Sequence, residues 1–479
     1  MTVTALRDDA LRTAPDGFTL LLGLPWIRSL PVASLVDLSV AVDGQSATDV
    51  TIELDGRRVA PTALGAEDTW WFLQDRLTIR GSTELAPGPH VVAVTFRLVV
   101  PYLQAGPDGP LTLPFHLERT LTADASASGP ATARTSSLRE RPVEPRAAVP
   151  AGWTLTASAF NWTPEVVRAE RDAAEIEVGI VADGIVSAIE LEAGQLWRSF
   201  PDPDDAEVDA FRRDLEAVGG SVSIVGASLD DWLSPARRRD DDERLAFLIP
   251  QLHAARRVGA AAVRLPIGQA GTPLLRRLVP VLHDLDLVLY EEAQGQQSPQ
   301  NPATAAAFDA IADIDDPHVR ALVDISMLMP SLPPSYLERL RTGGVDEAFL
   351  DAVATDWRDP ATNGAVIDLL RADRVPAEVH TMFMNLLVRF GRSDAADLRG
   401  ILPLVGAIHL KFWDLDDEGG RVSQPIRDLA AELAAVGFTG TLCSEWGGHE
   451  WLDEDSATMT RAHLALASSA LDARARDRV

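Results

Sequence analysis

Lys411 is the only lysine among the 43 lysine and arginine residues of the chain, and it lies two positions after a histidine. Both residues belong to the mostly apolar run Ala407-Ile408-His409-Leu410-Lys411-Phe412-Trp413. A chain that otherwise uses arginine keeps here a compact, flexible ammonium group in place of a planar guanidinium. We interpret His409 and Lys411 as the first marker of an active site, with a lysine retained by chance as the alternative.

Three carboxylates stand at the ends of other apolar segments: Glu292, Asp324 and Glu445. A charge at the end of a buried strand costs several kcal/mol unless it is paired or bound to a metal. Three carboxylates and one imidazole favour a divalent ion over a thiolate-type zinc site. We therefore predict that Glu292, Asp324, His409 and Glu445 bind one divalent ion, with Mn²⁺ as the first choice and Mg²⁺ or Co²⁺ as alternatives. For each residue taken singly, an ordinary strand-end ion pair is the competing interpretation.

The elements that would position these residues alternate between strands and helices from Trp153 onward. Strands are predicted at 155–160, 187–191, 222–225, 262–265, 285–291, 319–324, 407–412 and 441–445, with helix-like stretches between them. Eight strands, each followed by a helix, are typical of an α/β TIM barrel, whose active sites lie at the C-terminal ends of the strands. We therefore predict a barrel for residues 153–479, with a doubly wound sheet as the alternative.

Residues 1–122 follow a different pattern, in which short apolar segments are separated by turn signals such as Asp43-Gly44 and Asp55-Gly56. Such spacing favours an all-β sandwich. Residues 123–152 are rich in Ala, Ser, Arg and Pro and are predicted to be a linker.

Composition limits the partners of the chain. A formal net charge of −28 disfavours nucleic acid and anionic membranes as partners, because phosphate groups are repelled. No stretch approaches the roughly 18 apolar residues of a membrane span, and residues 1–14 contain no apolar signal core. The single cysteine, Cys443, excludes an internal disulfide framework. We expect a cytoplasmic protein that acts on a small molecule; homo-oligomerisation is left open.

Specific motifs resemble a known family. Glu292, Asp324, His409 and Glu445 follow the ligand order of the xylose-isomerase-like sugar isomerase and epimerase barrels. The α subunits of C-glycoside deglycosidases are the most similar group, on the runs Val323-Asp324-Ile325-Ser326, His409-Leu410-Lys411-Phe412-Trp413 and Ser444-Glu445-Trp446. The N-terminal segment resembles their β subunit in Gly23-Leu24-Pro25-Trp26-Ile27-Arg28 and Trp70-Trp71-Phe72. The family usually keeps the two subunits as separate chains, whereas here they are fused, β first.

The resemblance implies a metal-dependent lyase that cleaves 3-keto glycosides by removal of the C2 proton and β-elimination of the aglycone. It implies that Glu292 and Glu445 share metal binding and proton transfer, and that Lys411 supplies positive charge. The family's Glu-x-His motif is replaced here by Glu292-Ala293-Gln294, and glutamine cannot accept a proton. His449 is the substitute candidate for the base, with a surface-loop histidine as the alternative.

Four further residues are predicted to bind substrate: Arg264, Glu192, Trp413 and Trp446. For Arg264 a structural ion pair is equally open, and Asp230 is a second carboxylate that could reach sugar hydroxyls. Two other functions remain as alternatives. One is a sugar epimerase or isomerase, which would use the same enolate chemistry. The other is a non-catalytic carbohydrate-binding protein, in which the N-terminal domain would be the recognition module.

Overall fold

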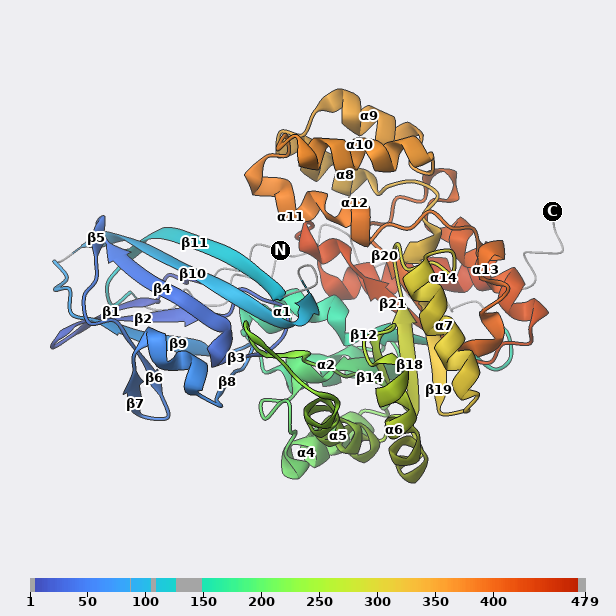
Figure 1. Cartoon of the computed structure of the whole chain (residues 1–479), viewed down its shortest axis with the longest axis horizontal. Coiled ribbons are helices and arrows are strands. Elements are labelled where there is room, and N and C mark those ends of the chain that lie inside the picture. Colours follow the sequence, from blue (N-terminus) through green and yellow to red (C-terminus); the bar gives the residue numbers. More distant parts are fainter. Residues whose placement is uncertain (1–4, 87, 105–108, 126–148, 473–479) are drawn as a thin grey trace.

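The computed structural model describes residues 5–86, 88–104, 109–125 and 149–472 (Figure 1). These ranges contain a group of N-terminal sheets, a closed barrel, and helices inserted into the barrel. No helix within these ranges is long and apolar enough to cross a membrane.

The N-terminal sheets are antiparallel, and two of them carry most of the strands. The first has the order β1 (Leu11–Ala14), β2 (Gly17–Gly23), β9 (Arg76–Gly81), β6 (Thr51–Leu54) and β7 (Arg57–Val59). The second has the order β11 (Pro110–Thr122), β10 (Pro89–Gln104), β4 (Leu35–Val42) and β5 (Gln45–Ser46). Alternate side chains of β2 and β4 are buried and belong to one apolar cluster, as expected when two sheets each bury one face. The predicted all-β fold is confirmed.

Eight parallel strands close into the predicted TIM barrel, so the doubly wound alternative is wrong. Their order is β12 (Trp153–Ser158), β13 (Ala188–Glu192), β14 (Ser221–Gly226), β17 (Ala262–Pro266), β18 (Val288–Ala293), β19 (Val319–Asp324), β20 (Val405–Phe412) and β21 (Gly440–Trp446). The connecting helices include α2 (Ala173–Ala182), α4 (Asp205–Ala217), α5 (Asp241–Val258), α6 (Gly271–Leu285), α7 (Pro302–Ile314), α13 (Ser423–Ala435) and α14 (Ser456–Leu471). Strands covered on both faces are apolar along most of their length, which makes the charged residues in β18 to β21 conspicuous.

A helical insertion, which the sequence pattern did not reveal, separates β19 from β20. It contains α8 (Pro334–Thr342), α9 (Glu347–Thr355), α10 (Pro360–Arg371), α11 (His380–Phe383) and α12 (Asn385–Val388), which gather above the barrel in Figure 1. The insertion has a hydrophobic cluster of its own, which includes Tyr336, Trp357 and Phe390 and also Trp413, the residue directly after β20.

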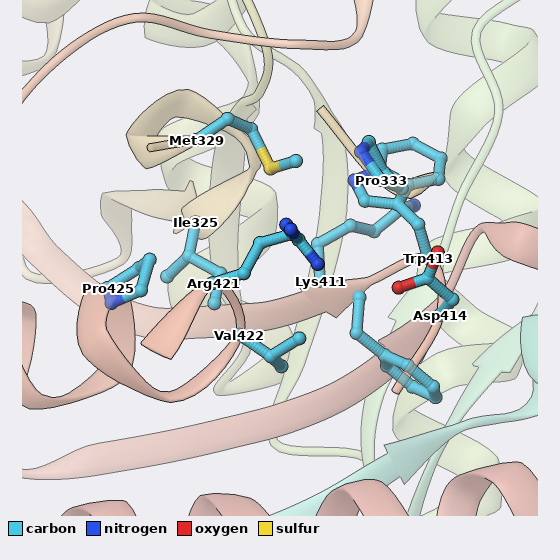
Figure 2. Close-up of a pocket in the computed structure, with 10 residues that line it drawn as sticks. Ile325, Met329, Pro333, Lys411, Trp413, Asp414, Arg421, Val422 and Pro425 are labelled. Carbon is cyan, nitrogen blue, oxygen red and sulfur yellow. The ribbon is translucent and has the colours of Figure 1, made fainter. Parts of the chain in front are cut away.

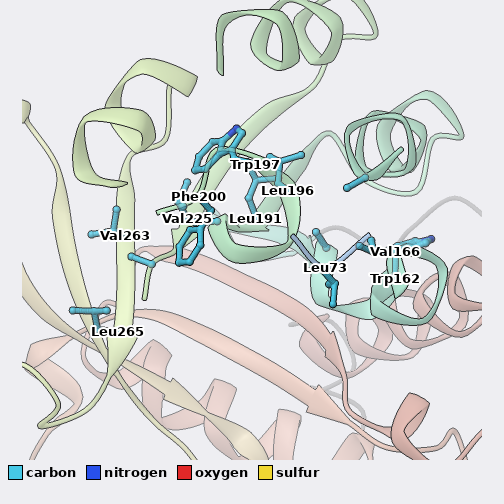
Figure 3. Close-up of a cluster of buried hydrophobic side chains, with 14 of the residues drawn as sticks. Leu73, Trp162, Val166, Leu191, Leu196, Trp197, Phe200, Val225, Val263 and Leu265 are labelled. Atoms are coloured by element: carbon cyan, nitrogen blue, oxygen red, sulfur yellow. The ribbon is translucent and has the colours of Figure 1, made fainter. Parts of the chain in front are cut away.

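The N-terminal sheets pack directly on the barrel. The side-chain amide of Gln195 donates to the Ile27 carbonyl at 2.8 Å, and that of Gln74 donates to the Val166 carbonyl at 2.9 Å. Leu73 lies in the same buried apolar cluster as Val166 and Trp162 of the barrel part (Figure 3). The two parts therefore share a continuous core. Most of the predicted linker, at 126–148, lies outside the described residues, so the boundaries 1–122, 123–152 and 153–479 stay predictions.

Candidate metal centre and active site

The four predicted metal ligands come together at one end of the barrel. Glu292, Asp324, His409 and Glu445 lie toward the C-terminal ends of the adjacent strands β18, β19, β20 and β21, and each offers a ligand atom within 4.8 Å of the others. Asp324 is the register partner of His409, and Lys411 is the register partner of Glu445. His409 and Lys411 lie on the same face of β20, because strand side chains alternate.

Unsatisfied lone pairs converge in this group. His409 Nδ1 lies 2.6 Å from Glu445 Oε2 and 3.1 Å from Glu292 Oε1. Despite these short distances, His409 Nδ1, Glu445 Oε2 and Asp324 Oδ2 are buried atoms that make no well-aligned hydrogen bond with any described residue. Buried polar atoms almost always have a partner. A divalent cation bound between these atoms would satisfy all of them, so the residues present fit such an ion.

The charges around the site also favour a cation. Five carboxylates gather there, from Glu190, Glu192, Glu292, Asp324 and Glu445, whereas the permanent cations that they face within the described chain are Arg264 and Lys411. Mutually repelling carboxylates at low dielectric raise the free energy of the fold unless a counter-charge is present. A divalent ion would supply that counter-charge.

The pKa values of the ligands reflect this charge imbalance. Burial lowers the pKa of His409, but Glu190, Glu445 and Glu292 outweigh it and raise that pKa well above its usual range. Burial likewise raises the pKa of Glu445, yet Lys411 and His409 hold it well below the ordinary value. The pKa of Asp324 is raised to about 6, mainly by burial. A proton and a metal ion would therefore compete for the same His409 nitrogen.

Glu190, which the sequence analysis did not single out, holds the other side of His409. Both of its carboxylate oxygens lie 3.1 Å from His409 Nε2. A carboxylate on the second ring nitrogen is the usual way in which a metal-binding histidine is oriented. The alternation in Glu190-Leu191-Glu192 was the available signal, because it puts two carboxylates on one face of a buried strand.

Cys443 also lies near His409 and Glu190, in an arrangement that could hold a metal. Burial raises the pKa of its thiol well above the ordinary value. The thiol therefore stays protonated, and a protonated thiol is a poor metal ligand.

Arg264, predicted either to bind substrate or to form a structural pair, forms ion pairs with three carboxylates. Its Nη1 lies 3.0 Å from Glu292 Oε2, and its other two nitrogens form very close pairs with Glu190 and Glu192. All three guanidinium nitrogens are thus engaged by the protein. Arg264 therefore links Glu292 of β18 to Glu190 and Glu192 of β13, and it leaves no free nitrogen for a substrate.

Lys411 is a buried, charged neighbour of the predicted ligands. Its Nζ donates to Glu445 Oε1 at 2.9 Å. Burial lowers the pKa of Lys411, but Glu445 and Asp324 raise it to a net value above normal, so the ammonium keeps its charge. The side chain lines a narrow pocket of about 20 Å³, together with Trp413 and Asp414 (Figure 2). A pocket of that volume holds about one water molecule.

Trp413 and Trp446, both predicted to bind substrate, are buried side chains. Trp413 lines the pocket beside Lys411 and packs on Phe390 and Trp451, with ring centroids 4.9 Å and 5.6 Å away. Trp446 is fully buried, and its indole N–H donates to the Trp413 carbonyl at 2.9 Å. Strand alternation explains its position, because Trp446 follows the inward-facing Glu445 and packs outward against α14. The structure therefore does not bring Trp446 to the pocket.

His449 is buried rather than placed in a surface loop, so that alternative interpretation is wrong. Its side chain packs on Phe160, with ring centroids 4.8 Å apart, and neither ring nitrogen has a hydrogen-bond partner among the described residues. Burial, followed by the charges of Lys411 and Arg389, lowers its pKa to about 3. His449 is therefore a neutral imidazole with both nitrogens unengaged, close to the ligands.

Glu192 is the last residue of β13 and Asp230 lies shortly after the neighbouring strand β14, but their surroundings differ. Burial raises the pKa of Glu192 to about 7, and its side chain remains 19% exposed. Glu192 can therefore hold or release a proton near neutral pH. Asp230 pairs instead with Arg28 of the N-terminal sheets at 2.9 Å. This carboxylate thus belongs to the contact between the two parts of the chain.

Comparison with known proteins identifies the relatives of the chain. No protein-family model matches it. Over 285 residues it is 29% identical to the C-glycoside deglycosidase alpha subunit of Arthrobacter globiformis. The match covers 58% of this chain and 80% of that protein. Its N-terminal region is 31% identical over 99 residues to the 3'-dehydrocarminate deglycosidase beta subunit of a Microbacterium species, covering 20% of this chain and 75% of that protein. The chain belongs to the C-glycoside deglycosidase family.

The predicted family resemblance is thus confirmed, and regions similar to two separately named subunits are joined in one chain. As a member of this family, the chain is an enzyme that acts on sugars. Among solved structures, a xylose isomerase domain protein from Alicyclobacillus acidocaldarius is 16% identical with a TM-score of 0.39; the match covers 68% of this chain and 99% of that one.

Proposed function

We propose that the chain is a metal-dependent lyase that cleaves 3-keto glycosides, including those with a carbon–carbon bond to the aglycone. The observation that carries this proposal is the convergence of Glu292, Asp324, His409 and Glu445 beside the charged Lys411. Relatives named C-glycoside deglycosidases support the choice of substrate class.

The four converging residues would hold one divalent ion, with Mn²⁺ preferred over Mg²⁺ or Co²⁺ in our proposal. When bound, such an ion supplies Lewis acidity to a carbonyl oxygen. Glu190 would keep the His409 ring oriented through Nε2, so that Nδ1 is left for the ion.

Proton transfer is assigned to the chain's own carboxylates. Burial raises the pKa of Glu292, but Arg264 and His409 outweigh it, so Glu292 is ionised, as is Glu445. Either carboxylate can accept the C2 proton, and His449 is the weaker candidate for the base, because its lowered pKa disfavours the protonated ring. The electron pair of the C2–H bond forms the C1=C2 double bond, and the pair of the C1–aglycone bond leaves with the aglycone.

The departing aglycone needs a proton, and Glu192 is our choice of donor. Its pKa of about 7 lets it carry a proton at neutral pH. Lys411 remains charged throughout and stabilises the negative charge that develops on the sugar. No water molecule is consumed in this elimination.

We further propose that residues 1–122 act as a fused counterpart of the β subunit, residues 123–152 as the linker and residues 153–479 as the catalytic barrel. The matches to separately named alpha and beta subunits support this division.

Incubation with a 3-keto glycoside and, separately, with a free ketose tests the proposal. We expect release of free aglycone in the first reaction and no change in the second. The Asp324→Asn variant and the chelator-treated protein serve as controls and should release none. Conversion of the ketose to an isomeric sugar without aglycone release would favour the epimerase or isomerase alternative. Full activity of a metal-free preparation would contradict the metal dependence.

A further inference from the structure

A second, polar pocket lies outside the metal site, between the loop after β18 and the segment that follows α12. It has a volume of about 230 Å³ and is lined mainly by Gln296, Ser298, Gln300, Arg392, Ser393 and Asp397. A cavity of about 150 Å³ already accommodates a benzene ring. This pocket, which we call the Arg392 pocket, therefore has room for a ring-sized group.

The guanidinium of Arg392 is held in place without an ion-pair partner among the residues that the structure describes. Its Nε donates to the Trp357 carbonyl at 2.9 Å, and its central carbon lies 3.6 Å from the centroid of the Trp357 ring. Nη2 is buried and makes no hydrogen bond with any residue in the described ranges. Burial lowers the pKa of Arg392 to about 10, and no opposing charge offsets it.

Neighbouring arginines differ from Arg392 in this respect. Arg389 pairs with Glu450 at 2.5 Å, and Arg358 forms a close pair with Asp394. The one carboxylate in the pocket wall, Asp397, uses Oδ2 to accept the Asp394 amide at 2.8 Å. In an acidic chain with abundant carboxylates, a half-buried arginine with no ion-pair partner among the described residues is unfavourable unless a ligand provides the anion.

The walls of the Arg392 pocket connect to the predicted metal site through Ser326. The Gly391 amide donates to the Ser326 carbonyl at 2.7 Å, and the Gly295 amide donates to the Ser326 hydroxyl at 3.0 Å. The Ser326 amide in turn donates to Asp324 Oδ1 at 2.7 Å. A group bound in the pocket would therefore lie near the metal ligands.

We propose that the Arg392 pocket binds a carboxylate-bearing, ring-sized group, with the guanidinium of Arg392 as the anion-binding element. A guanidinium forms a charge-assisted hydrogen bond with a carboxylate, and the Gln and Ser side chains of the wall offer further hydrogen bonds. The carboxylate comes either from an acidic substituent on the aglycone of the substrate or from a separate free acid.

Calorimetric titration with benzoate tests the binding, with neutral benzamide as the matched probe. We expect benzoate to bind the full chain, and Arg392→Met to weaken that binding by about 10- to 100-fold, as loss of a hydrogen bond to a charged group predicts. Arg399→Met, which removes a surface arginine paired with Glu432, should leave binding unchanged. Equal affinity for benzoate and benzamide, or unchanged benzoate binding by Arg392→Met, would overturn the proposal.

A second variant protects the test against misfolding of Arg392→Met. Ser298→Trp fills the Arg392 pocket without altering Arg392, and it should abolish benzoate binding while the circular dichroism spectrum stays unchanged. Undiminished binding by a folded Ser298→Trp variant would refute the location of the site.

The source of the carboxylate is found from kcat/KM on two 3-keto glycosides, with and without a carboxyl group on the aglycone. If Arg392→Met lowers kcat/KM for the acidic substrate more than for the neutral substrate, the aglycone carries the carboxylate. If Arg392→Met changes kcat/KM equally for the two substrates, the carboxylate belongs to a separate acid. This arm rests on the proposed lyase function. The benzoate titration needs no turnover, so a failure of the lyase proposal leaves it unaffected.

Discussion

Arg28 joins the N-terminal sheets to the barrel through a buried ion pair, and its replacement tests how far the two parts depend on each other. Its Nη2 lies 2.9 Å from Asp230 Oδ1, and the two side chains are 9% and 1% exposed. The Arg28 guanidinium also lies over the Tyr102 ring, 4.0 Å from its centroid. We expect Arg28→Met to destabilise the whole chain.

The magnitude follows from what the substitution leaves behind. Methionine retains most of the aliphatic stem, but the Asp230 carboxylate stays buried without a counter-charge. Asp230 Oδ2 already has no hydrogen-bond partner among the described residues. Removing one partner of a buried pair costs about 3–5 kcal/mol, and the lost cation–π contact adds about 1 kcal/mol. The double variant Arg28→Met/Asp230→Leu should recover most of this loss, because no buried charge remains.

Arg198→Met is the matched control. Arg198 also pairs across the two parts, with Asp75 at 2.6 Å, and also lies over an aromatic ring, that of Phe72. These two side chains are 59% and 45% exposed, so the expected loss is about 0–1 kcal/mol. Urea unfolding followed by both tryptophan fluorescence and circular dichroism measures the difference. The reasoning is refuted if Arg28→Met lowers the free energy of unfolding no more than Arg198→Met does.

Three shorter predictions concern the metal, the lysine and a buried glutamate. Asp324→Asn removes one of the four proposed ligands, so elemental analysis should find bound Mn²⁺ falling from about one ion per chain to near zero; normal metal content would exclude Asp324 as a ligand. Lys411→Arg should lower kcat on a 3-keto glycoside by about 10²-fold, because a wider, planar head cannot replace the ammonium beside Glu445; wild-type turnover would make the lone lysine an accident of composition. Burial, and then the charges of Glu192 and Asp172, raise the pKa of Glu177 well above its ordinary value of 4.5. The fold therefore favours protonated Glu177, and the associated stability is lost as the pH rises above about 4.5. Glu177→Gln should raise Tm relative to wild type at pH 7.5 but not at pH 4.5, and an equal shift at both pH values would contradict this assignment.

The barrel and the clustering of Glu292, Asp324, His409 and Glu445 could be predicted because each strand and each of these residues has a recognisable local sequence pattern. A strand covered on both faces reads as a short apolar run, and a carboxylate or imidazole within it is rare enough to stand out. The strands predicted at 319–324 and 407–412 match β19 and the C-terminal part of β20. Since parallel strands align their C-terminal ends, residues remote in sequence could be expected at one edge.

The interactions that local pattern could not reveal are those between strands. Arg264 pairs with carboxylates from β13 and β18, and nothing in its own segment indicates those partners. Likewise, Trp446 has the apolar character of a pocket residue but faces the helical layer, because its neighbour Glu445 occupies the inward position. No element was predicted between the strands at 319–324 and 407–412, where the helical insertion lies.

The helical insertion has a consequence for the order in which the protein folds. Asp324 and His409 face each other across neighbouring strands, yet all five helices of the insertion lie between them in sequence. Contacts that close so long a loop form slowly, because chain entropy is lost before they are made. Asp324 and His409 therefore come together only once β19 and β20 have paired across the insertion. A divalent ion that binds this state and not the open chain would stabilise the folded protein by an amount that grows with the concentration of the ion.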